Sequence, residues 1–452
     1  MRSLLLLGAV LAGLVAGVPP SVADDIIRRQ QSIRSLPGQL DAVLMVNDNN
    51  PELIKEDGIL LSTFPNGGDA SISVDLNGRF DLFSHHVYAG TDETLDSTLW
   101  LALLVAPIGD EAVDLALIEG STSLSQATLP DQTAAPFLPL PALMRETSDA
   151  IAAGPGSRVA GDLLKGRRAP ELSQRRWILK PGAPTVVLQL PIPVQGLDPL
   201  LNGRNIQLRL HSSAPVALAT LAAHGNGHEP PGEQDWIDLL NSGELSGKEH
   251  SPSPRGSKGK IIYSRVSGVQ VGSRWQARVT DPGSKTLSIQ NEPLSWPISS
   301  LERGSLGTGQ VQTAELRALY PATAWAAHGN YGVEYDLTLP LKNRGSTAQT
   351  LSLALESPLK TDQASNALQF RSSDSGPVMF RGPVEVVGLD DPTGTPYGRQ
   401  TVHLVLRQGQ EGPSLGQVRL GPGEARDVQI RLIYPADATP PQVLTVRPVK
   451  QS

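Results

Sequence analysis

Apolar and polar residues alternate in several short stretches of the chain. In residues 333–339, Val, Tyr, Leu and Leu occupy every second position, with Glu, Asp and Thr between them. A period of two is typical of a strand with one buried face. Similar apolar runs lie at residues 99–105, 112–118 and 350–355, and the turn-forming residues Gly (44) and Pro (38) are abundant. The pattern predicts a mainly β protein built from antiparallel strands.

Two parts of the chain resemble each other at a nearly constant spacing. The runs on either side of Gly109 match those on either side of Gly345, 236 residues later. Residues 177–191 match residues 418–432, and each segment contains a Pro-Gly turn, the two turns being 241 residues apart. We expect a hairpin at each of these four places and, from the matches, two antiparallel β-sandwich domains of Ig-like or jelly-roll-like type with long loops. A chance likeness between two β segments is the alternative.

A polar segment over residues 243–260 separates the two halves, because its Gly, Ser, Pro and Lys residues offer few side chains for a core. The expected organisation is an N-terminal sandwich domain with an insertion over residues 24–245, a linker over 246–260 and a C-terminal sandwich domain over 261–452. Helices are expected to be few and short, over residues 142–153, 158–164 and 233–240.

The first 23 residues have the layout of a secretory signal. Arg2 precedes an apolar run over residues 4–18, two prolines follow, and small residues at Ser21 and Ala23 suit a signal peptidase. The apolar run is shorter than the ~20 residues of a membrane-spanning helix. We expect cleavage after Ala23, export to the periplasm or cell envelope, and no transmembrane segment in the mature chain.

Composition narrows the possible chemistry. The chain has no Cys, which excludes disulfides, zinc-thiolate sites and Cys nucleophiles. With 38 basic and 45 acidic residues its net charge is −7, which argues against a nucleic-acid partner. The Ser357-x-x-Lys360 motif lacks the other elements of serine enzymes that carry it. No catalytic residue and no cofactor is therefore predicted.

Two segments carry residue types found at metal sites. His224 and His228 lie four residues apart, but the glycines between them disfavour the helix that would place both on one face, so we interpret residues 224–229 as a polar loop. Residues 46–52 are rich in side-chain oxygens but lack the spacing of a calcium loop, so an Asx-rich turn is the favoured interpretation. No metal site is predicted.

Aromatic and histidine residues near strand ends are the candidates for binding. Trp275, Trp296 and Trp325 are expected near loops, where they would stack on sugar rings. In residues 328–332, His328, Asn330 and Tyr331 precede a predicted strand, and His86 and Tyr88 are the possible counterparts in the first half. The alternative is structural: Tyr331 caps a core and donates its hydroxyl to a backbone carbonyl.

A basic stretch offers a further possible contact. Residues 165–168 contain one Lys and two Arg, and Arg175 and Arg176 follow closely. These side chains could meet an anionic glycan or a phosphate, although a solvated loop that balances nearby acids is the favoured interpretation.

Several strings resemble those of an exported, mainly cyanobacterial family of unknown function. The strings are Gly154-Pro-Gly-Ser-Arg158, Leu201-Asn-Gly-Arg204, Gly307-Thr-Gly-Gln-Val-Gln312, Ala327-His-Gly-Asn-Tyr-Gly332 and Tyr434-Pro-Ala-Asp-Ala-Thr-Pro-Pro-Gln442. The resemblance spans most of the mature chain. It implies a periplasmic or envelope location and brings no established activity, cofactor or catalytic residue.

These observations lead to two functional hypotheses. The first is a non-enzymatic envelope protein that binds a glycan or another envelope protein through the loops of its sandwiches. The alternative is a hydrolase of polysaccharide or cell wall that uses paired carboxylates, whose positions the sequence alone does not identify.

Overall fold

The computed structural model describes residues 25–449, apart from residues 66, 92, 93, 95, 148, 149, 263 and 392. The expected signal peptide lies outside the described residues. Within them the chain forms 24 strands and two α-helices, which confirms a mainly β protein. No helix in this part of the chain is long and apolar enough to span a membrane.

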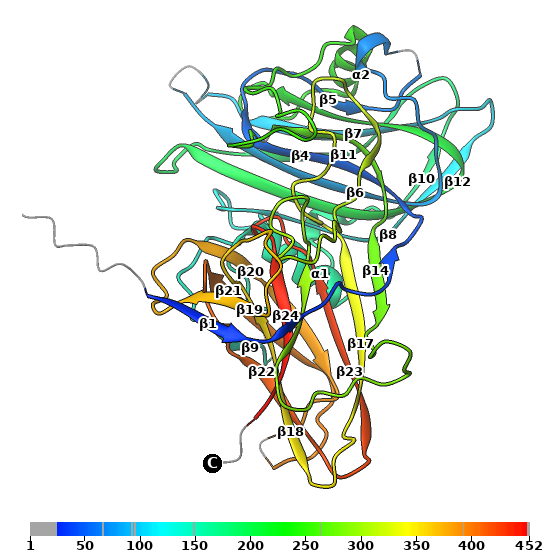
Figure 1. Ribbon diagram of the computed structural model, residues 1–452. Helices are drawn as coiled ribbons and strands as arrows, with labels where there is room; N and C mark the ends of the chain where they lie inside the picture. The colour runs from blue at the N-terminus through cyan, green and yellow to red at the C-terminus, as the bar shows by residue number, and fades with distance from the viewer. Residues whose placement is uncertain are drawn as a thin grey trace, which may run out of the picture.

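Most of the first half of the chain forms a sheet of ten described strands (Figure 1). Its strands are β4 (Leu44–Ile54), β5 (Gly58–Ser62), β6 (Leu76–Ala89), β7 (Leu99–Pro107), β8 (Val113–Leu124), β10 (Arg176–Leu179), β11 (Thr185–Ile192), β12 (Leu201–His224), β13 (Val266–Val271) and β16 (Leu316–Leu319). Strand β12 is 24 residues long; residues 204–212 pair with β6 and β8, and residues 216–224 pair with β7. The strand therefore changes partners along its length, and a buried core packs against both parts.

Most of the second half forms two further sheets, and the strands from β17 onwards are drawn in yellow to red in Figure 1. The larger contains β3 (Gln39–Leu40), β9 (Leu143–Arg145), β14 (Arg274–Arg278), β17 (Glu334–Lys342), β20 (Val378–Val387), β21 (Gln400–Arg407) and β23 (Ala425–Ile433). The smaller contains β2 (Ser32–Ile33), β15 (Leu294–Ile298), β18 (Gln349–Glu356), β22 (Ser414–Leu420) and β24 (Gln442–Pro448), while β1 (Ile26–Gln30) and β19 (Ala367–Arg371) pair separately. Side chains from both sheets, including Trp296, Tyr335 and Phe380, share one core.

At the four places predicted as hairpins, the two flanking strands do not pair with each other in the described part of the chain. Among the described pairings, β7 bonds to β11 while β8 bonds to β10, and β17 bonds to β23 while β18 bonds to β22. The hairpin prediction is therefore wrong. The two halves nevertheless connect their strands in the same way, and Trp177 pairs with Leu115 as Val418 pairs with Leu351. The likeness seen in the sequence extends to the strand pairing.

Strands also cross the boundary expected at residues 246–260. Strands β2 and β3, near the N-terminus, pair with β15 and β14 of the second half. In the opposite direction, β13 and β16 of the second half join the ten-stranded sheet next to β4. The division into two domains stays a prediction, and each half completes sheets of the other.

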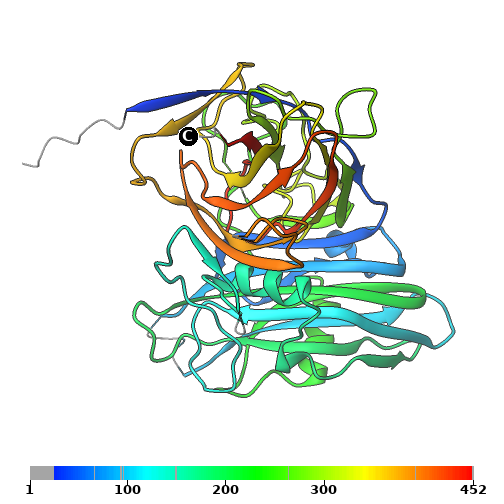
Figure 2. The ribbon, with the colours of Figure 1, turned by 90° about the horizontal axis from the view of Figure 1, so that it is seen from below.

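The two helices are α1 (Pro155–Leu164) and α2 (Glu233–Ser242), and short 3-10 turns lie at Gly68–Ala70 and Pro170–Leu172. Both α-helices confirm the expected positions at residues 158–164 and 233–240. The helix expected over residues 142–153 is wrong, because residues 143–145 form β9 and pair with β21. Helix α1 lies between the halves (Figure 2), in contact with β8 and β12 on one side and with β20 and β23 on the other.

Candidate functional site

The loop of residues 328–332 packs between the two halves. We call the region where β6 and β12 meet β17 and β23 the junction. Gln207 Nε2 on β12 donates a hydrogen bond to the carbonyl of Gly332 at 2.6 Å, and the ring of Phe83 stacks on Tyr331 with centroids 6.2 Å apart. Gly332 has φ +77°, and a Cβ there would lie 2.8 Å from Phe83, so the close approach of the two halves requires glycine.

Asn330 and Tyr331 have structural hydrogen bonds. The Asn330 Nδ2 donates to the carbonyl of Gln312 at 3.0 Å and to Tyr335 Oη at 2.7 Å, and Asn330 is 1% exposed. The Tyr331 hydroxyl donates to the carbonyl of Ala438 at 3.0 Å, the contact described above as the structural alternative. The hydrogen bonds of both side chains therefore fix the loop within the second half, and the Tyr331 ring contacts Phe83 of the first half.

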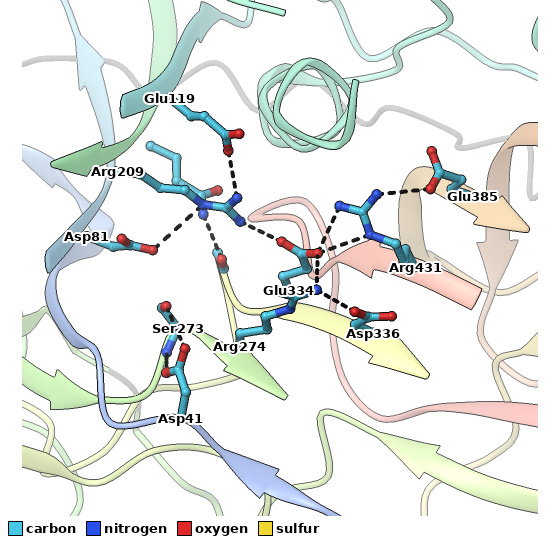
Figure 3. Close-up of polar contacts among 12 residues, drawn as sticks. Asp41, Asp81, Glu119, Arg209, Ser273, Arg274, Glu334, Asp336, Glu385 and Arg431 are labelled. Carbon is cyan, nitrogen blue, oxygen red and sulfur yellow. Dashed lines mark hydrogen bonds and ion pairs between the residues drawn. The ribbon is translucent and has the colours of Figure 1, made fainter. Parts of the chain in front are cut away.

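A chain of ion pairs follows the junction (Figure 3). Arg209 Nη1 lies 2.7 Å from Glu119 Oε2, and its Nη2 lies 2.7 Å from Glu334 Oε2. Glu334 Oε1 in turn contacts Arg431 Nη2 at 2.9 Å, and Arg431 Nη1 contacts Glu385 Oε1 at 3.0 Å. Burial alone would raise the pKa of Glu334, but the guanidinium groups of Arg209 and Arg431 outweigh burial and lower it. The charges alternate in sign, so their evident role is to join the halves.

Four more candidate residues are buried within the sheets. His86 and Tyr88 lie in β6 rather than in a loop, and His86 Nε2 lies 2.9 Å from Asp48 Oδ2. Trp275 donates its Nε1 proton to the carbonyl of Pro37 at 2.9 Å, and Trp296 is 1% exposed in the core of the second half. Their surroundings give them packing roles, and a ligand would reach them only after the sheets opened.

Trp325 and His328 line one pocket, which we call the Trp325 pocket. Its volume is about 320 Å³, and its walls come from residues 252–258, 301–303 and 324–328, with Ile262 and Val311. The guanidinium of Arg255 lies 4.6 Å from the centre of the Trp325 ring. Burial lowers the pKa of His328 to about 4, so its imidazole is neutral at pH 7. The pocket therefore offers one aromatic face, a neutral imidazole and apolar side chains.

The residues considered for metal binding do not converge. His224 contacts Asp57 through Nδ1 at 2.7 Å and Tyr88 through Nε2 at 3.0 Å, while His228 Nδ1 lies 3.2 Å from Thr98 Oγ1. No group of three or more His, Asp or Glu suited to a metal occurs in the described part of the chain.

The oxygen-rich segment at residues 46–52 belongs to strand β4, but the strand is irregular between Asn49 and Leu53, and there Asn50 Oδ1 accepts a hydrogen bond from the Glu52 amide at 3.0 Å, as in an Asx turn. Asn47 Nδ2 donates to Gln270 Oε1 at 2.8 Å, and Asp48 contacts His86. Partners on the neighbouring strands β13 and β6 thus bond one side-chain atom each of Asn47 and Asp48 within the strand.

These features define a mainly β protein with stacked sheets, a polar junction and a pocket built from loops. Residues 31–448 match the family model described as Protein of unknown function (DUF3370), and the chain belongs to this family. This confirms the resemblance to a family of unknown function that spans most of the chain. Comparison with curated proteins gives no match.

The strings that carry the resemblance meet at the junction. The Ser157 amide donates to Asp437 Oδ2 at 2.9 Å, and the Gly332 amide donates to the carbonyl of Tyr434 at 2.9 Å. Together with the bond from Asn330 to Gln312, these contacts join four of the five strings. Sequence reasoning did not identify the junction, because its partners lie far apart along the chain.

Proposed function

We propose that this protein is exported and works in the periplasm or cell envelope, where it binds a glycan or another envelope protein through its loops without catalysing a reaction. The observation that carries the proposal is the Trp325 pocket. Three loop segments from different parts of the second half build it, and two residues chosen from sequence line it. Its volume of about 320 Å³ lies within the usual range for small-ligand sites, roughly 300–1,000 Å³.

The lining suits a ligand with one flat apolar face. Trp325 supplies an aromatic surface, and Ile262 and Val311 are 47% and 48% exposed beside it. Arg303 and Lys258 add hydrogen-bond donors around this surface, while the Arg255 guanidinium lies over the Trp325 ring and pairs with Glu315 at 2.6 Å. A sugar ring has both kinds of surface, since one face carries C–H groups and its edge carries hydroxyls.

The export part of the proposal rests on residues 1–23 and on the resemblance to an exported, mainly cyanobacterial family. N-terminal sequencing of the mature protein from the envelope fraction should begin at Asp24. A chain that begins at Met1 and is recovered from the cytosol would contradict export.

Paired carboxylates would favour the hydrolase alternative. Among its described lining residues the Trp325 pocket has a single carboxylate, Glu302. A retaining or inverting glycosidase uses two that flank the scissile bond. Release of new reducing ends from envelope polysaccharide by the purified chain would support the hydrolase and count against the binding role.

Binding of the purified mature chain to isolated envelope material tests the binding role. We expect Trp325→Ala to weaken binding roughly tenfold, the loss of one stacked aromatic contact. Phe137→Ala is the matched control, because Phe137 is an exposed ring under a guanidinium, that of Arg381 at 5.2 Å, and does not line the pocket. Equal binding by both variants would contradict the proposal.

A further inference from the structure

A second and larger hollow lies beside the residues that follow α1, and we call it the basic groove. Its volume is about 1,070 Å³. Its walls come from β9, from the residues that follow α1, from the loop between β20 and β21, and from β22. Segments of both halves of the chain therefore build it.

Positive charge dominates the described lining of the groove. The basic side chains are Arg145, Lys165, Arg167, Arg399 and Arg419, and the acidic ones are Glu146, Asp390 and Asp391. Five positive and three negative groups give the lining a net charge of +2, on a chain whose net charge is −7. Such a contrast concentrates anions at the groove.

Each acidic group in the lining already has a structural partner. Lys165 forms an ion pair with Glu146, and Arg426, which lies outside the groove, forms one with Asp390. Asp391 Oδ1 accepts hydrogen bonds from the Thr393 and Thr395 amides at 2.8 and 3.0 Å and so closes a turn. The two ion-paired carboxylates therefore oppose an incoming anion less than their number suggests, while Asp391, whose hydrogen bonds lower its pKa, keeps its negative charge.

The arginines of the groove have few ion-pair partners, so most of their positive charge is available to an incoming anion. Arg145 donates to Gln400 Oε1 at 2.6 Å and to the carbonyl of Leu415 at 3.2 Å, both neutral acceptors. Arg167 and Arg419 are exposed, and no ion pair joins either to another described residue. Arg399 has one contact, with Glu385 at 3.4 Å, and its side chain is 63% exposed.

The groove also carries an exposed aromatic ring and neutral hydrogen-bonding groups. Tyr397 is 52% exposed, and Gln400, Thr401 and Gln417 lie along the walls. Cations suit carboxylate or sulfate groups, the amides and hydroxyls suit sugar hydroxyls, and the tyrosine ring suits the face of a sugar ring. The volume of the groove lies at the upper end of the range for ligand sites, roughly 300–1,000 Å³, so it has room for more than one sugar ring.

From this geometry we infer that the basic groove binds an anionic polysaccharide whose sugars carry carboxylate or sulfate groups. The inference does not depend on the Trp325 pocket, which shares none of its lining residues with the groove. An experiment can therefore contradict binding at one site without affecting the proposal for the other.

Binding of the mature chain to polygalacturonate of defined length tests the inference, with an uncharged glucose polymer of equal length as the comparison. We expect binding at low ionic strength that weakens as salt is added, and no binding of the neutral polymer. The double variant Arg167→Ala/Arg419→Ala should bind roughly tenfold more weakly. Arg175→Ala should bind like the wild type, because Arg175 is an exposed arginine from the same basic stretch that does not line the groove.

Three results would overturn the inference: no binding of polygalacturonate at low salt, an equal loss of binding in Arg175→Ala, or inorganic polyphosphate bound as tightly as the polysaccharide. The last would show that charge alone is recognised. Trp325→Ala should leave polygalacturonate binding unchanged, and this separates the outcome from that of the proposed loop-binding role.

Discussion

Arg209 Nη2 on β12 lies 2.7 Å from Glu334 Oε2 on β17, and this ion pair joins the ten-stranded sheet to the seven-stranded sheet. The Glu334 side chain is 3% exposed, and Arg431 on β23 contacts the same carboxylate from the second half. One buried carboxylate thus holds guanidinium groups of both halves. This contact adds to the shared strands and to the bond from Gln207 to Gly332 in fixing the position of the halves.

Glu334→Gln should destabilise the protein strongly. The substitution leaves the guanidinium groups of Arg209 and Arg431 without their shared carboxylate, and breaking a buried ion pair costs about 3 kcal/mol. Urea denaturation measures the change in the free energy of unfolding. Asp427→Asn is the control, because its pair with Arg278 is exposed, and it should change this free energy very little. Equal effects would contradict a structural role for the junction pair.

The same carboxylate predicts a dependence on pH. The arginines hold the pKa of folded Glu334 below that of the unfolded chain, so its contribution is fully present only above the unfolded pKa of about 4.3 and is lost as pH falls through the folded pKa. The difference in unfolding free energy between wild type and Glu334→Gln should therefore shrink as the pH is lowered from 5 towards 3. A difference that stays constant over this range would argue against an ionised Glu334.

Asn330→Ala should lower the melting temperature by about 2 °C, whatever it does to binding. The amide donates two buried hydrogen bonds, and leaving Tyr335 Oη and the Gln312 carbonyl without their donor costs about 2 kcal/mol. Asn291→Ala, on the exposed surface, is the matched control. Calorimetry of both variants measures the change in melting temperature. An unchanged melting temperature for Asn330→Ala would contradict its structural role and return this residue to the binding candidates.

Proteolysis in residues 246–260 should cut the chain without separating the halves. The segment contains no described strand, so it is open to cleavage and should give two fragments of similar size on a denaturing gel. Under native conditions the fragments should elute together, because β13 and β16 stay paired in the ten-stranded sheet and β2 and β3 stay paired in the other sheets. Separate elution would favour two independent domains.

The sequence predicted strands well where the pattern is local. The alternation at residues 333–339 corresponds to β17, and the Pro-Gly turns lie between β10 and β11 and between β22 and β23. The sheet to which each strand belongs could not be predicted. The residue pattern of an apolar strand is the same whether the strand pairs with its neighbour in sequence or with a strand far along the chain. The polar start of β4 was also missed, since its partners His86 and Gln270 lie far along the chain.

The candidate binding residues were also chosen without knowledge of their distant partners. Asn330 and Trp296 have the residue types of binding loops, yet partners distant in sequence bury them. Trp325 and His328 do meet in one pocket, because both lie in one loop beside the polar segment that was expected to be a linker. The basic groove contains Lys165 and Arg167 from the basic stretch, but its other cations come from β9, β22 and the residues before β21. Only the folded chain brings these together.

Hydrogen–deuterium exchange of the mature chain, with and without isolated envelope glycan, tests the central claim most directly. Loops that bind a ligand exchange more slowly when it is present, while the rest of the backbone is unaffected. The proposed function predicts added protection in residues 252–262 and 324–328, which build the Trp325 pocket. It also predicts that Trp325→Ala removes this protection and that Phe137→Ala retains it. An exchange pattern that envelope glycan leaves unchanged at these loops, or the same protection in Trp325→Ala, would contradict binding through the pocket.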